Sequence, residues 1–427
     1  MLYNDGKTFR KLTGMDGIIY YLRSITDVPI ISRIALVVKV GSMMEDHNEY
    51  GLSHFLEHML VDKMKYPVQD NHIPSGLFCH AYTNFYETVY LFYNNQSKED
   101  DAYTFISDCM NGINEIISGT GLNPDAMERV RRDVQNEHST SVINKETAIK
   151  QLFMDEYPNI HLSIGDISFI NSFSFDDVFD YHRKWYTPDN AAIIIESNLE
   201  AEKIELLIAK KNTKLQTDPL ITDHSLNNEN GKWSCESKAK EKHNENFSPP
   251  GLYFISKYRR LISSPEKYME SLINLDLALE AFKLIVRNYL SLQGMQDYDV
   301  DGEVEIFSSD WHLVRFRIAF DENIIATDEI IHYLKTMELN KNIFYKTQKI
   351  CHQKIDDNTK DYSVQGKDFF INECIQNFLF SEPIFELIDE INLAHNAIDK
   401  ASFKAVQGCF DYIKRNCVLI HRQNQVN

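Results

Sequence analysis

The sequence is poor in cysteine and has no long apolar run. Its seven cysteines among 427 residues are scattered, odd in number and without any C-x-x-C pair. This pattern is typical of a reducing compartment. No segment approaches the roughly 20 apolar residues of a membrane helix, and the first residues lack the apolar stretch of a signal peptide. We therefore predict a cytoplasmic protein without a membrane span.

Basic residues are also scarce, with 44 Lys and Arg against 63 Asp and Glu and a formal net charge of -19. Such a charge repels phosphate backbones and anionic lipids, so no nucleic-acid partner is expected. The composition of 43% hydrophobic and 12% aromatic residues is that of a globular protein. A chain of 427 residues is too long for one ordinary core and favours two domains.

Apolar periodicity predicts alternating strands and helices in the first half. A polar stretch over residues 213–248 predicts a linker or surface excursion. One short internal repeat indicates duplication, because the similar segments FDYHRK (179–184) and FDYIKR (410–415) each precede an apolar strand. We predict an α+β fold of two tandem related domains, each a mixed or antiparallel sheet packed with helices. Their bounds are 1–212 for a catalytic domain and 249–427 for a second domain without its motif.

The segment GLSHFLEHML (51–60) places His54, Glu57 and His58 in an apolar helical pattern. Residues four apart share one helix face, so both imidazoles can reach one ion. A catalytic zinc takes three protein ligands and leaves a position open for water, and Glu57 lies beside the pair as a proton acceptor. These residue types match peptide-bond hydrolysis.

A third ligand must come from another element. The helix predicted over about 125–149 offers Glu137, with Glu128 and His138 as rival candidates. An exposed helix carboxylate without metal function is the ordinary alternative. We interpret His72, His161 and His182 as ordinary surface or core histidines.

The order H-x-x-E-H is the inverzincin signature, and the surrounding segments resemble the pitrilysin/insulinase metallopeptidases. The resemblance covers roughly residues 15–200. It includes GSMMED (41–46), Gly51, AYTN with ETVYLF behind it, RVRRDVQNE, the YPNIHLSIGD loop with Gly165, and WYTPDN (185–190).

The resemblance implies one Zn²⁺ per chain, with His54, His58 and Glu137 as ligands and Glu57 as general base. It also implies that an edge strand at His80, Ala81, Tyr82 and Thr83 pairs with the backbone of an extended peptide.

Two departures from the family pattern stand out. The family's second glutamate, seven residues before the ligand glutamate, is replaced by Val130, and Asp133 is a substitute candidate. The Arg and Tyr that hold the substrate carbonyl are also missing. Tyr298 has Ser291 seven residues earlier, and Arg287 lies in a predicted helix.

The missing pair implies a homologous partner subunit that supplies it in a heterodimer, with a homodimer as the other arrangement. Partnered chains of this kind resemble bacterial peptidases that trim leaders from ribosomally made antibiotic peptides (bacteriocins). The competing hypothesis is a non-catalytic scaffold subunit. The intact set of His54, Glu57, His58 and Glu137 favours the peptidase.

Overall fold

A computed structural model describes most of the chain. The described residues are 9–14, 16–25, 32–65, 78–93, 99–140, 149–150, 153, 160–211, 241–243, 251–260, 264–320, 326–365 and 369–422. Two compact units appear. Unit 1 comprises Met1–Ser141, Glu156–Asn228 and Asp368–Ile384, and unit 2 comprises Val142–Asp155, Glu229–Lys367 and Phe385–Asn427.

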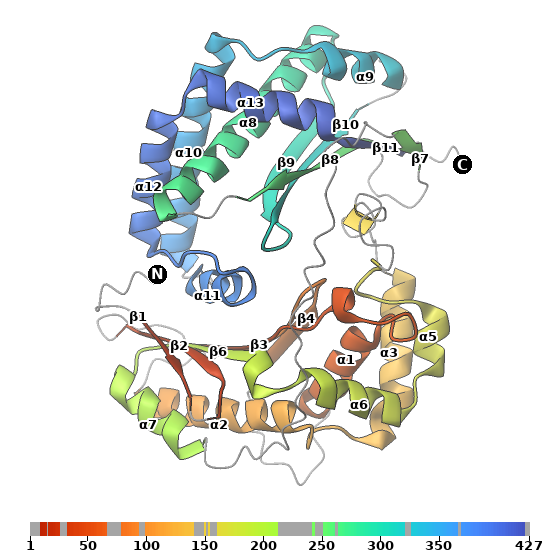
Figure 1. Ribbon diagram of the computed structural model, residues 1–427, viewed down its shortest axis with the longest axis vertical. Helices are drawn as coiled ribbons and strands as arrows, with labels where there is room; N and C mark the ends of the chain where they lie inside the picture. Colours follow the sequence, from red (N-terminus) through yellow and green to blue (C-terminus); the bar gives the residue numbers. More distant parts are fainter. Residues whose placement is uncertain are drawn as a thin grey trace. The chain divides into compact units, whose positions relative to one another are not determined.

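Unit 1 is built on a six-stranded mixed sheet (Figure 1). The strand order is β1 (Phe9–Thr13), β2 (Ile19–Ser24), β6 (Ala191–Ser197), β3 (Arg33–Val38), β5 (Thr88–Tyr93) and β4 (Phe78–Thr83). Strand β6 pairs parallel with β2 and antiparallel with β3. Strand β4 pairs antiparallel with β5 and ends the sheet.

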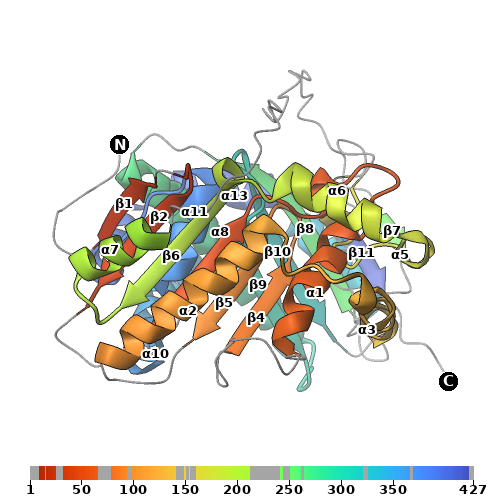
Figure 2. The same ribbon diagram turned by 90° about the horizontal axis from the view of Figure 1, so that it is seen from below.

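Helices of the first half cover one face of this sheet, as seen from below in Figure 2. They are α1 (Leu52–Lys65), α2 (Glu99–Ser118), α3 (Met127–Thr140), α5 (Ile167–Ser172), α6 (Phe175–Trp185) and α7 (Ala201–Lys211). Along β3, Ile34, Leu36 and Val38 face these helices, while Ala35 and Val37 face the opposite side. Both faces of the central strands are therefore buried, which explains the continuous apolar run of β6.

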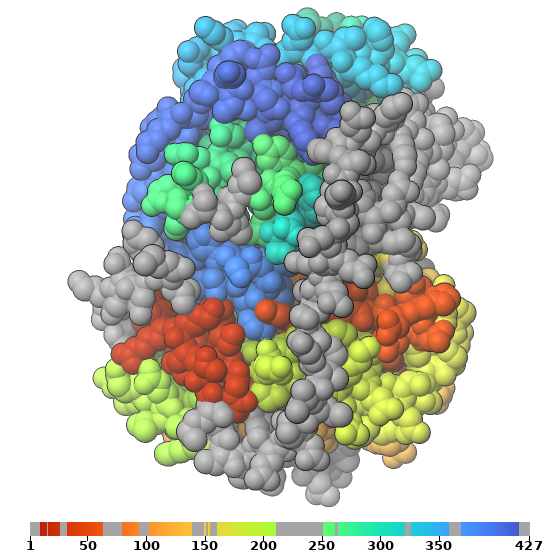
Figure 3. Space-filling model, in the orientation of Figure 1, coloured from red at the N-terminus to blue at the C-terminus, as the bar shows by residue number. Residues whose placement is uncertain are grey.

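The opposite face is covered by α11 (Phe369–Phe380), which comes from the far end of the sequence. Its buried side chains Phe370 and Phe378 pack on Tyr21 and Ile194. In the space-filling view, this blue segment lies directly against red N-terminal residues (Figure 3). The predicted second domain, 249–427, includes this helix, whereas its contacts lie with the first sheet.

Unit 2 repeats the plan around a five-stranded sheet (Figure 1). The strand order is β7 (Glu241–His243), β11 (Val418–Arg422), β8 (Gly251–Arg259), β10 (Trp311–Ala319) and β9 (Asp299–Ile306). The core helix α8 (Pro265–Leu292) packs with α10 (Lys341–Gln365), α12 (Leu387–Lys400) and α13 (Phe403–Asn416). The described helices also include α9 (Thr327–Thr336).

The two sheets share a topology. The order β6-β3-β5-β4 in unit 1 corresponds to β11-β8-β10-β9 in unit 2, and the helix after β3 (α1) corresponds to the helix after β8 (α8). The predicted α+β fold of two related domains is confirmed. Residues 241–243 form a strand, although they lie in the predicted linker, and the rest of 213–248 lies outside the described residues.

Strands β4 and β5 form a hairpin, and Asn123 caps the turn before α3 by accepting a hydrogen bond from the Asp125 amide at 3.0 Å. None of the described helices combines the length and the apolar character that a membrane span requires. The six described cysteines form no disulfide. A cytoplasmic location stays a prediction.

The packing of α11 generates a test. Phe378→Ala removes a side chain that is 5% exposed and should destabilise unit 1 by about 3–5 kcal/mol. Leu206→Ala on α7, where the side chain is 61% exposed, is the control and should change stability by less than about 0.5 kcal/mol. Hydrogen exchange of the β3 and β6 amides measures the effect. Equal protection in both variants would show that α11 does not stabilise the sheet.

Candidate functional site

The start of α1 is held by the carboxylate of Glu45. This buried side chain accepts hydrogen bonds from the backbone amides of Gly51 and Ser53, each at 2.7 Å. The first amides of a helix have no partner inside the helix, and negative charge is favourable there. The third partner is His161, whose Nε2 lies 2.5 Å from Glu45 Oε2. Glu45 therefore fixes the first turn of α1 to the loop that carries His161.

Two glycines let that loop approach the helix. Gly51 and Gly165 have φ values of +98° and +80°. A Cβ atom on Gly51 would lie 2.8 Å from the Gly165 Cα, and one on Gly165 would lie 2.3 Å from the Gly51 Cα. Only glycine fits both the conformation and the space. Two motif glycines that are distant in sequence thus meet at the first turn of the helix that carries His54.

Helix α1 presents one apolar and one polar face. Its apolar side chains, Leu52, Phe55, Leu56, Met59 and Leu60, are all at most 2% exposed. The helix is tied to α3 by a bidentate ion pair in which Arg129 Nε and Nη2 contact the two oxygens of Asp62 at 2.8 and 2.5 Å. Bidentate geometry fixes orientation as well as distance. The position of α3 beside α1 is therefore set close to the polar face.

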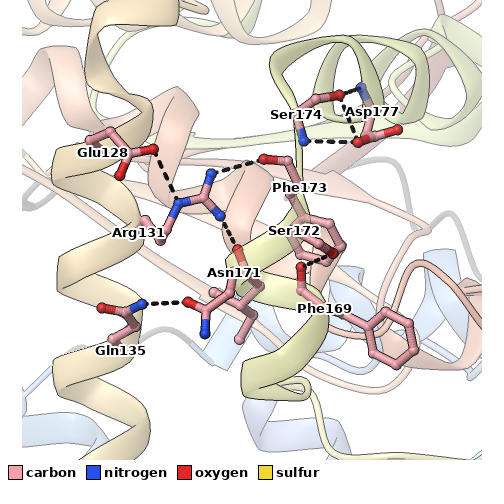
Figure 4. Close-up of polar contacts among 10 residues, drawn as sticks. Glu128, Arg131, Gln135, Phe169, Asn171, Ser172, Phe173, Ser174 and Asp177 are labelled. Carbon is pink, nitrogen blue, oxygen red and sulfur yellow. Dashed lines mark hydrogen bonds and ion pairs between the residues drawn. The ribbon is translucent and has the colours of Figure 1, made fainter.

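Helix α3 is also fixed on its other side (Figure 4). Arg131 donates hydrogen bonds to the backbone carbonyls of Ile170 and Phe173, and Gln135 donates to Asn171 Oδ1 at 2.5 Å. Arg131 is also paired with Glu128, with Nε 3.3 Å from Oε1. The carboxylate of Glu128, the rival third ligand, thus points to an arginine beside α5 and α6.

The structure brings His54, His58 and Glu137 together. The two Nε2 atoms lie 3.2 Å apart, and Glu137 Oε2 lies 3.7 Å from His54 Nε2 and 3.3 Å from His58 Nε2. Among the described residues, this is the only group of three or more His, Cys, Asp or Glu side chains compact enough to hold a metal ion. It includes neither Glu128 nor His138.

The spacing of these three donors matches a zinc ion. Tetrahedral ligands at zinc bond lengths of about 2.0–2.2 Å lie roughly 3.3–3.5 Å from one another. The observed separations of 3.2, 3.3 and 3.7 Å fall close to that value. Two imidazole nitrogens and one carboxylate oxygen are also donors that zinc accepts. The group therefore fits a three-ligand zinc site with a fourth position open.

Glu57 lies on the same helix and is held by β4. Its side chain is buried, and Thr83 Oγ1 donates a hydrogen bond to Oε2 at 3.0 Å. Thr88 Oγ1 lies 3.3 Å from Thr83 Oγ1 and donates to the Val40 carbonyl at 2.9 Å. Thr83 therefore orients the Glu57 carboxylate.

A pair of tyrosines lies within the electrostatic influence of Glu57. The hydroxyls of Tyr90 and Tyr186 are 2.7 Å apart. Burial, together with the charges of Tyr186 and Glu57, raises the pKa of Tyr90 well above its ordinary value. Burial also raises the pKa of Tyr186. Both phenols therefore stay neutral and add no negative charge beside Glu57.

The edge of β4 carries the predicted peptide-binding residues. The Asn84 amide donates to the Glu87 carbonyl at 2.9 Å, so the backbone groups of Asn84 point toward β5. The direction of the backbone N–H and C=O groups alternates along a strand. Those of His80 and Tyr82 therefore also point toward β5, and those of Ala81 and Thr83 point away from it. Within the described residues, β4 pairs only with β5. Ala81 and Thr83 thus have their backbone groups at an open edge.

The residues at which the sequence departs from the family pattern all lie in the described part of the structure. Val130 is 1% exposed and packs in the core of unit 1, so no carboxylate could replace it without reorganisation. Asp133 makes no hydrogen bond or ion pair with the described residues, and its role as a substitute for the second glutamate stays a prediction. Arg287 lies in α8, as expected, and donates to the Val300 carbonyl at 2.6 Å. Tyr298 packs partly buried in unit 2.

The sequence reasoning missed the positioning role of Glu45 and His161. GSMMED marked Glu45 as a motif residue, but a pairing between positions 45 and 161 leaves no local pattern. The ordinary interpretation of His182 agrees with its buried ring, whose Nε2 contacts the Ile116 carbonyl at 2.7 Å. Burial also lowers the pKa of His182. His72 lies outside the described residues.

Comparisons with known proteins identify related sequences. Residues 24–164 match the family Insulinase (Peptidase family M16), and residues 172–251 match the Peptidase M16 inactive domain. The first match contains His54, Glu57, His58 and Glu137. The chain is 30% identical over 224 residues to "Probable zinc protease PqqL" of Haemophilus influenzae, covering 48% of this chain and 23% of that protein.

Solved structures share the fold. The periplasmic protease PqqL from Escherichia coli superposes with a TM-score of 0.75 at 12% identity, covering 98% of this chain and 48% of that one. The first half of the same protease gives a TM-score of 0.74 at 13% identity, covering 98% and 92%. The chain thus spans about half of the full Escherichia coli protease and less than a quarter of the Haemophilus relative. The two matches, over residues 24–164 and 172–251, are to domains of one peptidase family. The chain therefore belongs to the peptidase M16 (insulinase) family.

Proposed function

We propose that this chain is the zinc-dependent catalytic subunit of an endopeptidase that cleaves an extended peptide. The observation that carries the proposal is the triangle of His54 Nε2, His58 Nε2 and Glu137 Oε2, with sides of 3.2, 3.3 and 3.7 Å. The family match, which spans these residues, supports the same chemistry.

The three ligands would hold one Zn²⁺. When bound, zinc polarises the carbonyl that is attacked and makes water a stronger acid. Glu57, oriented by Thr83, accepts the proton of the attacking water. The carbonyl carbon gains the water oxygen and loses the amide nitrogen, and Glu57 returns the proton to that nitrogen. Burial of Glu57 excludes bulk water from this exchange.

The β4 edge would hold the substrate. Ala81 and Thr83 direct their backbone groups outward, so a peptide strand added there would pair with these two residues. His80 and Tyr82 would contribute side chains. Main-chain pairing binds an extended peptide without demanding one sequence. Thr83 would then contact the substrate through its backbone and Glu57 through its hydroxyl.

The function needs a partner that completes the site. The Arg287 side chain donates a hydrogen bond to the Val300 carbonyl, and Tyr298 packs against the core of unit 2. Both side chains are thus occupied within unit 2, and the two residues lack the sequence spacing of the family's Arg and Tyr. The similarity to the first half of a longer protease supports a complement of equal size. We propose a homologous subunit that supplies the Arg and Tyr, in a heterodimer and not a homodimer.

For the substrate we propose a ribosomally made precursor peptide with a leader, processed in the cytoplasm. The net charge of -19 favours a basic segment in that peptide. The absence of disulfides among the described cysteines agrees with a reducing compartment. A scaffold subunit without activity is the alternative, and the complete His-His-Glu set with a buried Glu57 argues against it.

His54→Ala should abolish the zinc that remains bound after dialysis in metal-free buffer, because two protein ligands exchange an ion much faster than three. Elemental analysis of the dialysed chain should fall from about one zinc per chain in the wild type to well below that value. His47→Ala, at an exposed histidine of unit 1, is the matched control and should retain zinc. Full retention in His54→Ala would contradict the ligand assignment.

Glu137→Gln and Glu128→Gln form a matched pair on one helix. Glu137→Gln should weaken zinc binding because an amide oxygen is a poorer ligand than a carboxylate. Glu128→Gln should bind zinc normally, since the Glu128 carboxylate contacts Arg131. Competition with a chromogenic chelator measures both affinities. The opposite ranking would move the third ligand to Glu128.

Glu57→Gln separates chemistry from metal binding. It keeps the size and hydrogen-bonding capacity of the side chain but removes its basic oxygen, so zinc should be retained. Cleavage should fall by about 100- to 10,000-fold, the usual contribution of a positioned acid or base. A time course on a candidate precursor peptide, with each chain alone and with its partner, measures the loss.

The same time course tests the partner. The wild-type chain alone should cleave weakly, and the partner should raise the rate without changing its zinc content. Equal cleavage by wild type and Glu57→Gln would exclude Glu57 as the base. Full activity of the lone wild-type chain would exclude the need for a partner.

A further inference from the structure

A second group of histidines lies in unit 2, where α10 packs beside α12. His352 of α10 and His395 of α12 approach through their Nδ1 atoms, which are 2.6 Å apart. Each ring is also held from its far side by a carboxylate. Asp399 Oδ1 lies 3.2 Å from His352 Nε2, and Asp356 Oδ1 lies 3.2 Å from His395 Nε2.

The carboxylates determine which ring nitrogens carry protons. An ionised carboxylate only accepts hydrogen bonds, so His352 Nε2 donates to Asp399, and in a neutral ring its Nδ1 then carries a lone pair. The Asp356 carboxylate, 3.2 Å from His395 Nε2, favours the same arrangement of protons in that ring. The ring planes differ by 12°, and 2.6 Å is closer than two stacked rings can approach. The rings therefore meet edge to edge, with their Nδ1 lone pairs facing each other. Two facing lone pairs repel unless a cation lies between them.

The charge and the ligand types favour a divalent transition metal over a proton. With both rings neutral, Asp356 and Asp399 give the group two negative charges, which a divalent ion balances and a single proton does not. Imidazole nitrogen suits zinc, copper and nickel, and not magnesium or calcium. Histidines that bind metals commonly donate their other ring N–H to a carboxylate, as His352 does to Asp399, and Asp356 lies within ion-pair distance of the same nitrogen of His395.

The geometry needs only a small adjustment to admit such an ion. Two ligands of a tetrahedral zinc lie about 3.3 Å apart, against 2.6 Å between the Nδ1 atoms here. The histidine side chains are 30% and 27% exposed, so they can rotate apart and water can fill the remaining positions. A site with two protein ligands exchanges its ion readily.

We propose that His352 and His395 form a second, exchangeable site for a divalent transition metal, which links α10 to α12. Asp356 and Asp399 are the positioning residues that hold the two rings. Nothing in this proposal depends on the proposed peptidase function, because all four residues belong to unit 2 and none takes part in the His54, His58 and Glu137 group.

Equilibrium dialysis of the full chain against micromolar free Zn²⁺ tests the proposal, followed by dialysis in metal-free buffer. The wild type should bind two zinc ions at equilibrium and retain one. His352→Gln and His395→Gln should each bind one and retain one. His332→Gln, at an exposed histidine of α9, is the control and should behave as wild type.

The positioning role has its own readout. Asp356→Asn should weaken the exchangeable site by about 10- to 100-fold and leave the retained zinc unchanged. Mg²⁺ in place of Zn²⁺ should not occupy the site. A wild-type chain that retains in metal-free buffer all the zinc it binds at equilibrium would overturn the proposal and leave a shared proton as the bridge. Two zinc ions in His352→Gln would also overturn it. Because retained and exchangeable zinc are counted separately, failure here is distinct from failure at His54.

Discussion

The fixed approach of α3 to α1 is the constraint on which the candidate site depends. Two ligands come from adjacent turns of one helix, but the third comes from another helix, and a shift of an ångström would separate Glu137 from the imidazoles. Arg129 holds α3 to Asp62 of α1, and on the other side Arg131 donates to the carbonyls of Ile170 in α5 and of Phe173 just after it. Two arginines on one helix thus set the position of a carboxylate two turns away.

The same logic explains the motifs around the histidines. Glu45 holds the first amides of α1, and the close backbone contact of Gly51 and Gly165 brings the His161 loop onto that turn. None of these residues belongs to the His-His-Glu group. They set the direction in which α1 leaves its first turn, and hence where His54, Glu57 and His58 point.

Much of this arrangement could be predicted from sequence because it is local or periodic. The helical spacing of His54 and His58, the β4–β5 hairpin and the cap at Asn123 follow from neighbouring residues. The contacts of α11 with the first sheet could not be predicted. An apolar helix face at 369–380 shows that it is buried but not against what, and its partners lie more than 170 residues away. The contact between Glu45 and His161 could not be predicted for the same reason.

The repeated topology shows how unit 2 differs. The helix that corresponds to α1 is α8, and near the corresponding edge strand β9 it carries Glu280 and Lys283, which are ion-paired, with Lys354 of α10 also bound to Glu280. Lys283 also donates to the Gly302 carbonyl of β9 at 3.1 Å. Buried charges persist at this position when they are paired. Ion pairs and a hydrogen bond thus link the helix and edge strand of unit 2 that correspond to the elements carrying His54, Glu57 and Thr83 in unit 1.

Crystals of the chain grown with zinc, with anomalous data collected at the zinc edge, would show whether two helices of unit 1 form a three-ligand zinc site. We expect an anomalous peak within about 2.0–2.2 Å of His54 Nε2, His58 Nε2 and a Glu137 oxygen after crystals are washed in metal-free buffer. A washed crystal with no peak among these three atoms, or with zinc held by Glu128, would contradict it.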